Sequence, residues 1–401
     1  MEVDRTAFWG RLLSILVAIS EAHFVSIDLE LSGVASKNLG GRARQATLEE
    51  RYAETKEAAE RYTILQIGVT CAYQDLTREV YVLRPYNFNL NPSFEERLDL
   101  ERIFSFQSGA VDFLLAHGFQ MNLPFTHGVP YLSRDEARRA KEIAKERLNR
   151  DQTGDIQLRE TDVQSLAFVE RIRNQIQIWI RTKKPSPDSL WITGIAPSGE
   201  SDAGSDVELT RFEKRLVHQL VRAEFKEYTT ISRQGGIKII RTDPVREQDF
   251  RNARMKAVRE QVNRQTGFRW IIEALAGGDL DKLDARHLAF NPQTGAPKAV
   301  DLNNIHSQLG RANDALSRRR PVLVGHNMFT DLIYLYKTFV GVLPDTVKQF
   351  SEKLHQLFPN IVDTKWLATQ ADSDIPSKSS LEEIEEKLRN VAIPKIGGLL
   401  L

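Results

Sequence analysis

The sequence predicts an α/β protein, in which a mixed sheet is flanked by helices and a small α+β module is inserted into the main domain. An apolar run at 24–33 is typical of a buried strand, and two further strand patterns follow closely at 63–73 and 78–83. Strands that lie so near one another in sequence favour an antiparallel start to the sheet. Between residues 160 and 243 the pattern changes to amphipathic helices around a polar stretch and one short strand, which indicates a separate module.

The first helices have clear start signals. Asp4 can cap a helix that runs to about Ala22, in which apolar residues recur at helical spacing. Thr47 and Glu50 form a capping-box pattern, which opens a charged helix that ends near Arg61. These signals place one helix before the first strand and one after it.

The later elements follow from periodicity and from turn residues. Helices are expected at 98–119, 134–150, 161–184, 208–226, 244–276 and 379–388, and short strands at 236–240, 320–325 and 361–363. The Gly-, Ser- and Asp-rich stretch at 196–206 is expected to be a loop. We therefore divide the chain into a first part of the main domain at 1–159, the inserted module at 160–243, and a second part of the main domain at 244–401.

The composition says more about where the protein is located in the cell than about what it binds. The 401 residues carry 55 Lys and Arg against 54 Asp and Glu, so a nucleic-acid surface has to be a local patch. The single Cys71 excludes an intramolecular disulfide and a Cys-based zinc site within the chain, which favours a reducing intracellular compartment. The apolar run at 12–19 is too short to span a bilayer and follows acidic residues, so we expect no signal peptide and no membrane span.

Two carboxylates interrupt the first strand. Asp28 and Glu30 are two residues apart, so their side chains project from the same face. Two adjacent carboxylates repel each other and are costly to desolvate unless a cation lies between them, and oxygen ligands suit Mg²⁺ or Mn²⁺. The pattern alone is equally consistent with a strand that has one solvated face.

A second polar stretch, Gly325-His326-Asn327, follows a strand near residue 325. Asn327 can cap the next helix, which would place Asp331 in its first turn, at the edge of the sheet where α/β proteins locate their sites. His326 by itself is more typical of a structural loop histidine than of a catalyst. Asp363 ends another short strand and, taken alone, is more typical of an N-cap or turn residue than of a metal ligand.

Taken together, these motifs resemble those of a known family of nucleases. Asp-x-Glu on a first strand, followed much later by Val-Gly-His-Asn-x-x-x-Asp, resembles the ribonuclease-H-like exonucleases with Asp-Glu-Asp-Asp sites, and specifically the poly(A)-specific ribonuclease family. The similarity extends over nearly the whole chain, through Glu50-Arg-Tyr52, Leu65-Gln-Ile-Gly68, Val111-Asp-Phe-Leu114, His127-Gly-Val-Pro-Tyr131 and Asp363-Thr-Lys365. The family carries an Arg-x-x-x-His-type nucleic-acid-binding domain at the place of the module at 160–243. Here Lys214 occupies the position of that arginine and His218 that of the histidine.

The resemblance implies a function and a set of site residues. It implies a 3′→5′ exoribonuclease that shortens mRNA poly(A) tails in the nucleus and cytoplasm, with two Mg²⁺ ions held by Asp28, Glu30 and Asp331. It implies RNA contacts at His326 and Asn327 in the main domain, and at Lys214 and His218 in the module. Single-stranded RNA 3′ ends and poly(A) are the implied partners, together with a second copy of the chain in a homodimer.

The sequence departs from the family near its end. In the family a fourth aspartate, and a general-base histidine five residues before it, follow the helix expected at 379–388, whereas the last histidine here is His355. Asp372 and Asp374 have no histidine nearby. We therefore expect the C-terminal end of the domain to be incomplete. Two alternatives stay open, namely a catalytically inactive RNA-binding relative and an exonuclease that trims the 3′ ends of small non-coding RNAs.

Overall fold

The computed structural model describes residues 1–35, 46–149, 156–182, 189–194, 208–278, 280–370, 375–376, 379–389 and 396–398. The chain divides into two units, one formed by residues 1–143 and 257–401 and the other by residues 144–256. The module expected at 160–243 falls inside the second unit. No helix in the described ranges is long and apolar enough to cross a membrane.

The first unit is built on the mixed sheet that the sequence predicts. The strand order is β10-β3-β2-β1-β8-β9, with β4 paired to β3. β1, β2 and β3 form the expected antiparallel meander, whereas β8 runs parallel to β1 and β9 parallel to β8. The bounds of the strands are β1 Phe24–Leu31, β2 Ile64–Asp75, β3 Val80–Asn91, β4 Val129–Pro130, β8 Val322–Gly325, β9 Ile361–Asp363 and β10 Ile396–Gly398.

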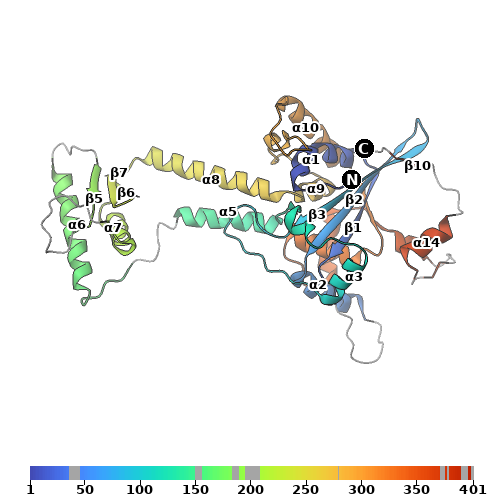
Figure 1. The fold of residues 1–401 in the computed structure, drawn as a ribbon, viewed down its shortest axis with the longest axis horizontal. Coiled ribbons are helices and arrows are strands. Elements are labelled where there is room, and N and C mark those ends of the chain that lie inside the picture. Colours follow the sequence, from blue (N-terminus) through green and yellow to red (C-terminus); the bar gives the residue numbers. More distant parts are fainter. Residues whose placement is uncertain are drawn as a thin grey trace. The chain divides into compact units, whose positions relative to one another are not determined.

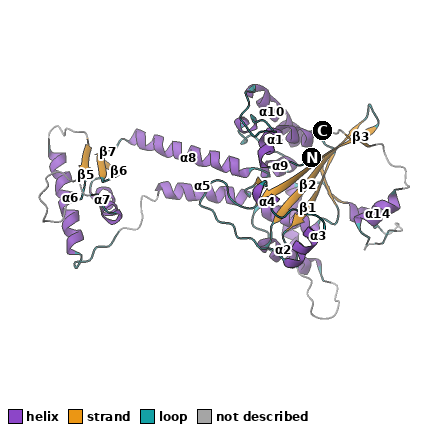
Figure 2. Cartoon of the chain, viewed as in Figure 1, coloured by secondary structure: helices purple, strands orange, loops and turns teal. Residues whose placement is uncertain are grey.

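Helices cover this sheet on both sides (Figures 1 and 2). α1 packs with α9 and α10, while α2 packs with α11 and α12. Asp4 caps α1 by accepting a hydrogen bond of 2.8 Å from the Ala7 N–H, and Thr47 and Glu50 form the predicted capping box at the start of α2. The bounds of the helices are α1 Arg5–Glu21, α2 Leu48–Arg61, α3 Ser108–Ala116, α4 Leu123–Thr126, α5 Arg134–Asn149, α9 Arg269–Leu275, α10 Leu302–Arg318, α11 Phe329–Leu335, α12 Val347–Leu357, α13 Thr364–Ala368 and α14 Leu381–Leu388. Short turns of 3₁₀-helix and of π-helix lie at Ala285–Leu288 and Tyr336–Val340.

Two predicted helices differ from the structure. The helix expected at 98–119 is confined to α3, because the segment before it is extended and bonds to distant backbone: the Ser105 N–H donates to the Arg61 carbonyl. The helix expected at 244–276 is divided into α8 Pro244–Thr266 and α9 at Gly267, which has a φ of +44°. There the Phe268 N–H donates to the Pro130 carbonyl, so a tertiary hydrogen bond ends the helix.

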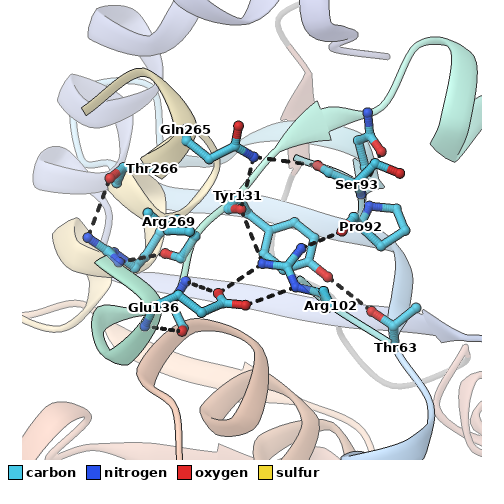
Figure 3. Close-up of polar contacts among 12 residues, drawn as sticks. Thr63, Pro92, Ser93, Arg102, Tyr131, Glu136, Gln265, Thr266 and Arg269 are labelled. Carbon is cyan, nitrogen blue, oxygen red and sulfur yellow. Dashed lines mark hydrogen bonds and ion pairs between the residues drawn. The ribbon is translucent and has the colours of Figure 1, made fainter. Parts of the chain in front are cut away.

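A buried polar network holds the edge of the first unit together (Figure 3). Arg102 forms two hydrogen bonds with the carboxylate of Glu136, of 3.0 and 2.8 Å, and its guanidinium lies 4.2 Å from the centre of the Tyr131 ring. The Tyr131 hydroxyl bonds to Thr63, while Gln265 donates to the Tyr131 carbonyl. Burial alone would raise the pKa of Glu136, but the charge and hydrogen bonds of Arg102, together with hydrogen bonds to Ser133, outweigh it and lower that pKa.

The second unit has its own sheet and core. Its strands β5 Ser189–Ile192, β7 Ile237–Arg241 and β6 Tyr228–Ser232 are antiparallel and lie in that order. Helices α6 Val163–Arg181 and α7 Arg211–Glu224 pack with this sheet. The core consists of Ile172, Ile176, Ile192, Leu209, Val217, Leu220, Val221, Ile237 and Ile239.

Candidate active site

The first carboxylate pair lies on the central strand of the large sheet. Along β1, Val25, Ile27 and Leu29 are buried, whereas Asp28 is exposed and Glu30 is half-buried. The alternation therefore sends both carboxylates to the face opposite the apolar residues. Because the apolar side of β1 packs into the core, the same packing that positions the strand also directs Asp28 and Glu30 away from the core.

The second group of residues lies at the ends of the neighbouring parallel strands. Ser26 is level with Val324 on β8, so β1 continues past the end of β8 and carries Asp28 to the height of the loop after Gly325. Gly325 is level with Asp363 on β9. The carboxyl ends of β8 and β9 thus meet the carboxylates of β1 at one edge of the sheet, which is the usual position of sites in α/β proteins.

The loop after β8 differs from the prediction in one respect. Asn327 does not cap α11; Met328 occupies that position, and Asn327 lies one residue earlier with a φ of +55°. Asparagine tolerates this left-handed conformation better than most residues. Asp331 lies in the first turn of α11, as predicted.

Asp363 holds this loop in place. One of its oxygens accepts the N–H of Asn327 and the other accepts that of Met328, both at 2.9 Å. It also caps α13 by accepting the N–H of Lys365. The prediction that Asp363 is an N-cap is confirmed, and its hydrogen bonds to the loop after β8 could not be foreseen from local sequence.

His326 is oriented by a short chain of hydrogen bonds. The Thr364 hydroxyl donates to the Gly325 carbonyl at 3.1 Å, so His326 Nδ1 donates to that hydroxyl, at 3.0 Å. In neutral histidine this arrangement leaves Nε2 as a hydrogen-bond acceptor. The ring is half-buried and stands beside the strand end that carries Asp363.

Two of these carboxyl groups have raised pKa values. Burial first, and then the negative charges of Asp28, Glu30 and Asp363, raise the pKa of Asp331 to about 7. Burial and Asp28 also raise the pKa of Glu30, against a smaller lowering by His117. The structure therefore brings Asp28, Glu30 and Asp331 into one electrostatic cluster, together with Asp363.

The donor set fits a hard divalent cation by its chemistry. All its members are carboxylates, and their mutual repulsion is the kind that a bound cation relieves. Within the described residues, no three His, Cys, Asp or Glu side chains already converge as a metal site. The carboxylates are thus close enough to raise the pKa values of Glu30 and Asp331, without already forming a converged metal site in the described part of the chain.

A cavity of about 570 Å³ adjoins this cluster at Glu30. Glu30, Gln66 and Asn89 are level with one another on β1, β2 and β3, and they form a polar row along its wall. Phe113 and His117, whose ring centres are 4.2 Å apart, line another part of it. His117 was missed in the sequence, because no motif connects it with Glu30 and only the fold brings α3 beside β1.

The two residues predicted in the module lie in the second unit, in a different cavity of about 650 Å³ between α7 and β6. Lys214 Nζ is 3.2 Å from Glu208, and both ring nitrogens of His218 bond to hydroxyls of β6, those of Thr230 and Ser232. Lys214 and His218 thus line one basic cavity, separate from the carboxylate cluster. Asp372 and Asp374 lie outside the described residues.

Comparison with known proteins gives a consistent result. The model of the CAF1 family ribonucleases matches residues 3–396. An uncharacterised protein of Schizosaccharomyces pombe is 28% identical over 93% of this chain and 76% of its own length. Human poly(A)-specific ribonuclease PARN is 24% identical over 99% of this chain and 56% of its own length. The Bombyx mori pre-piRNA 3′-exonuclease trimmer is 26% identical over 92% of this chain and 58% of its own length.

The chain spans little more than half the length of these last two relatives. The family match, by contrast, covers almost all of the chain, including the strand of Asp28 and Glu30, the inserted module and the loop of His326. A match of that extent shows the family. The chain belongs to the CAF1 family of ribonucleases.

Proposed function

We propose that this chain is the catalytic core of a metal-dependent 3′→5′ exoribonuclease that shortens poly(A) tails. The observation that carries the proposal is the cluster of Asp28, Glu30 and Asp331 at the carboxyl edge of the sheet, in which the pKa of Asp331 is raised to about 7. Clustered carboxylates repel one another when no cation lies between them, so a bound divalent cation would stabilise this cluster. Similarity to poly(A)-specific ribonucleases supports poly(A) as the substrate.

In this proposal Asp28, Glu30 and Asp331 hold two Mg²⁺ ions. Such a pair of ions supplies an activated water and stabilises the leaving oxygen of a phosphodiester. Asp363 keeps the loop of His326 and Asn327 beside the cluster, where both residues can contact the RNA backbone. The cavity next to Glu30 offers an aromatic ring, Phe113, and the amides of Gln66 and Asn89 to a base near the 3′ end.

A single assay tests the proposal. The chain is incubated with 5′-labelled oligo(A) in Mg²⁺ or in EDTA, together with the variants Asp28→Asn and Asp314→Asn. We expect a ladder that shortens from the 3′ end in Mg²⁺ only, its loss in Asp28→Asn, and its retention in Asp314→Asn, because Asp314 is an exposed residue of α10 outside the cluster. A ladder that persists in Asp28→Asn or in EDTA would contradict the proposed site.

A second substrate class is favoured by one comparison. A pre-piRNA 3′-exonuclease trimmer is similar over 92% of this chain, which supports trimming of non-coding RNA 3′ ends as an alternative. Oligo(A) and a mixed-sequence RNA of equal length separate the two substrates. Faster degradation of oligo(A) supports the deadenylase proposal, and equal rates support the trimming alternative. Homodimer formation and a nuclear and cytoplasmic location stay predictions.

A further inference from the structure

The sheet of the second unit has one face that its core does not use. Ile192 of β5, with Ile237 and Ile239 of β7, belongs to the core formed with α6 and α7. Because side chains alternate along a strand, the residues between them point to the opposite face. We call this opposite face the open face; it consists of Ser189, Trp191, Thr229, Ile231, Lys238 and Ile240. None of these six belongs to the core of the unit.

The register aligns three of these residues across the sheet. Trp191 on β5 is level with Lys238 on β7, which is level with Ile231 on β6. Trp191 is 43% exposed, and its ring packs along Gly236, where an added Cβ would lie 3.2 Å from the indole. The ring is thus held by the sheet while much of its surface faces solvent.

The open face continues into the basic cavity at the edge of β6. That cavity is lined by Arg211, Lys214, Arg215, Arg222 and Lys226, and on β6 by Thr229, Thr230 and Ser232. Thr230 and Ser232 point toward α7, where they bond to His218. Thr229 belongs to both surfaces, so β6 is the border between them. From β6 to β5 the sheet is two strand spacings wide, roughly 10 Å.

We propose that single-stranded RNA binds across this border, with most of its backbone in the basic cavity and its bases on the open face, one of them stacked on Trp191. Lys238 then lies beside the stacked base and neutralises the phosphate of that nucleotide, where the strand leaves the cavity. Charge favours RNA over a protein partner: no ion pair joins Lys238 to a carboxylate in the described part of the chain, and the adjoining cavity is lined by five cations against one acid, Glu247, although Lys214 among them pairs with Glu208. Stacking on an exposed ring and cations along the backbone are the two contacts that single-stranded nucleic acid requires.

This inference rests on the proposed function in one respect, because it takes RNA as the ligand. The inference concerns a different surface from the one that the sequence predicted: Lys214 and His218 lie in the cavity, whereas Trp191 and Lys238 lie on the open face. It gives the second unit a role in holding RNA upstream of the 3′ end while the carboxylate cluster acts on that end.

Binding of fluorescein-labelled 20-nucleotide oligo(A) to the full chain in EDTA tests the inference by anisotropy. We expect Trp191→Ser to weaken binding about tenfold, since stacking of one base is worth about that factor. Lys238→Gln should weaken binding less and reduce the slope of log K against log salt by about 0.7. The matched control is Phe212→Ser, which removes another exposed aromatic ring of the same unit and should leave affinity unchanged.

Two further measurements make the test specific. Trp191→Phe should retain most of the affinity but lose the quenching of tryptophan emission that accompanies RNA binding in the parent chain. Circular dichroism of each variant checks that the unit stays folded. Affinity that is equal in Trp191→Ser and Phe212→Ser, or an altered sedimentation coefficient with unaltered RNA affinity in Trp191→Ser, would overturn the inference. The second result would instead assign the open face to contact between copies of the chain.

The outcomes also separate this inference from the proposed function. If the parent chain degrades oligo(A) in Mg²⁺ and Trp191→Ser binds it normally, the inference fails and the nuclease proposal stands. If Trp191→Ser loses affinity while the parent chain binds but does not degrade the RNA, the inference stands and the nuclease proposal fails. A parent chain that neither binds nor degrades oligo(A) contradicts both.

Discussion

The ionisation of Asp331 depends strongly on its surroundings. In the folded chain its pKa is raised from the ordinary 3.8 to about 7, first by burial and then by three neighbouring carboxylates. The folded state therefore holds a proton more tightly than the unfolded state does. Its contribution to stability is present in full below pH 3.8 and is lost as the pH rises through 7.

Removing this charge should stabilise the metal-free chain at alkaline pH. We expect Asp331→Asn in EDTA to raise the melting temperature by about 2–6 °C at pH 8, a range that allows for the remaining solvent access of the group. At pH 5 the difference should be much smaller, because the carboxyl is then protonated. Added Mg²⁺ should raise the melting temperature of the parent chain at pH 8 more than that of Asp331→Asn. A lower melting temperature for Asp331→Asn at pH 8 than for the parent chain would contradict this account.

Arg102 has the opposite role, since it neutralises an acid whose side chain is only 27% exposed, Glu136. Its removal in Arg102→Met leaves the Glu136 carboxylate without its cation, which should cost about 3–5 kcal/mol of unfolding free energy. The control is Arg61→Met, which breaks an exposed pair with Glu57 and should cost less than about 0.5 kcal/mol. Urea unfolding followed by tryptophan fluorescence measures both. Equal losses in the two variants would show that the network of Figure 3 contributes no more than a surface pair.

At the scale of elements, local signals and tertiary contacts decide different things. The capping box of Thr47 and Glu50 and the alternation along β1 are local, and both predictions are confirmed. The break at Gly267 is not local, because the periodic pattern continues across it. It depends on the backbone of Pro130, whose carbonyl accepts the N–H of Phe268, the residue just before α9.

Substitutions at Gly267 and Gly310 test whether a tertiary contact, and not local sequence, ends the helix at Gly267. At Gly267 a Cβ would overlap the Pro130 carbonyl, and φ is +44°, so Gly267→Ala should destabilise the chain by about 2–4 kcal/mol. At Gly310, inside α10, a Cβ meets nothing within 4 Å, so Gly310→Ala should stabilise the chain by up to about 1 kcal/mol. Denaturant unfolding of the two variants gives the signs. Destabilisation by Gly310→Ala, or none by Gly267→Ala, would contradict the assignment.

At the scale of the whole molecule, the chain contains two separate hydrophobic cores. One is formed by residues of the first unit, including Leu16, and the other by the nine residues of the second unit, including Ile176. The second core is much the smaller, and a small core supplies less stabilisation against the loss of chain entropy. Each unit is therefore expected to unfold as its own cooperative transition.

Calorimetry of the full chain should show two transitions. Ile176 is fully buried, so Ile176→Ala should destabilise the second unit by about 2–5 kcal/mol and shift only the lower transition. Leu16→Ala removes a side chain of similar size from the first core and should shift only the upper one. Because the proposed ligands all lie in the first unit, Mg²⁺ should also raise only the upper transition. One transition that responds to both variants would contradict this expectation.

By itself, the sequence determined the elements whose signals are short in range. A period of two residues sends Asp28 and Glu30 to one face of β1 whatever surrounds the strand, and a capping residue starts a helix from within three residues. The order of motifs likewise predicted a mixed sheet with an insertion, and the structure confirms the fold class. Such features depend on neighbouring residues in the chain, so one sequence is enough to predict them.

Only the tertiary structure decided which distant groups meet. The hydrogen bonds of Asp363 to the loop after β8, the approach of His117 to Glu30 and the raised pKa of Asp331 depend on strands and helices from remote parts of the chain. The open face carrying Trp191 likewise depends on which side of its sheet α6 and α7 cover. Electrostatic coupling and burial are functions of distance through space, and separation along the chain does not determine that distance until the sheet has formed.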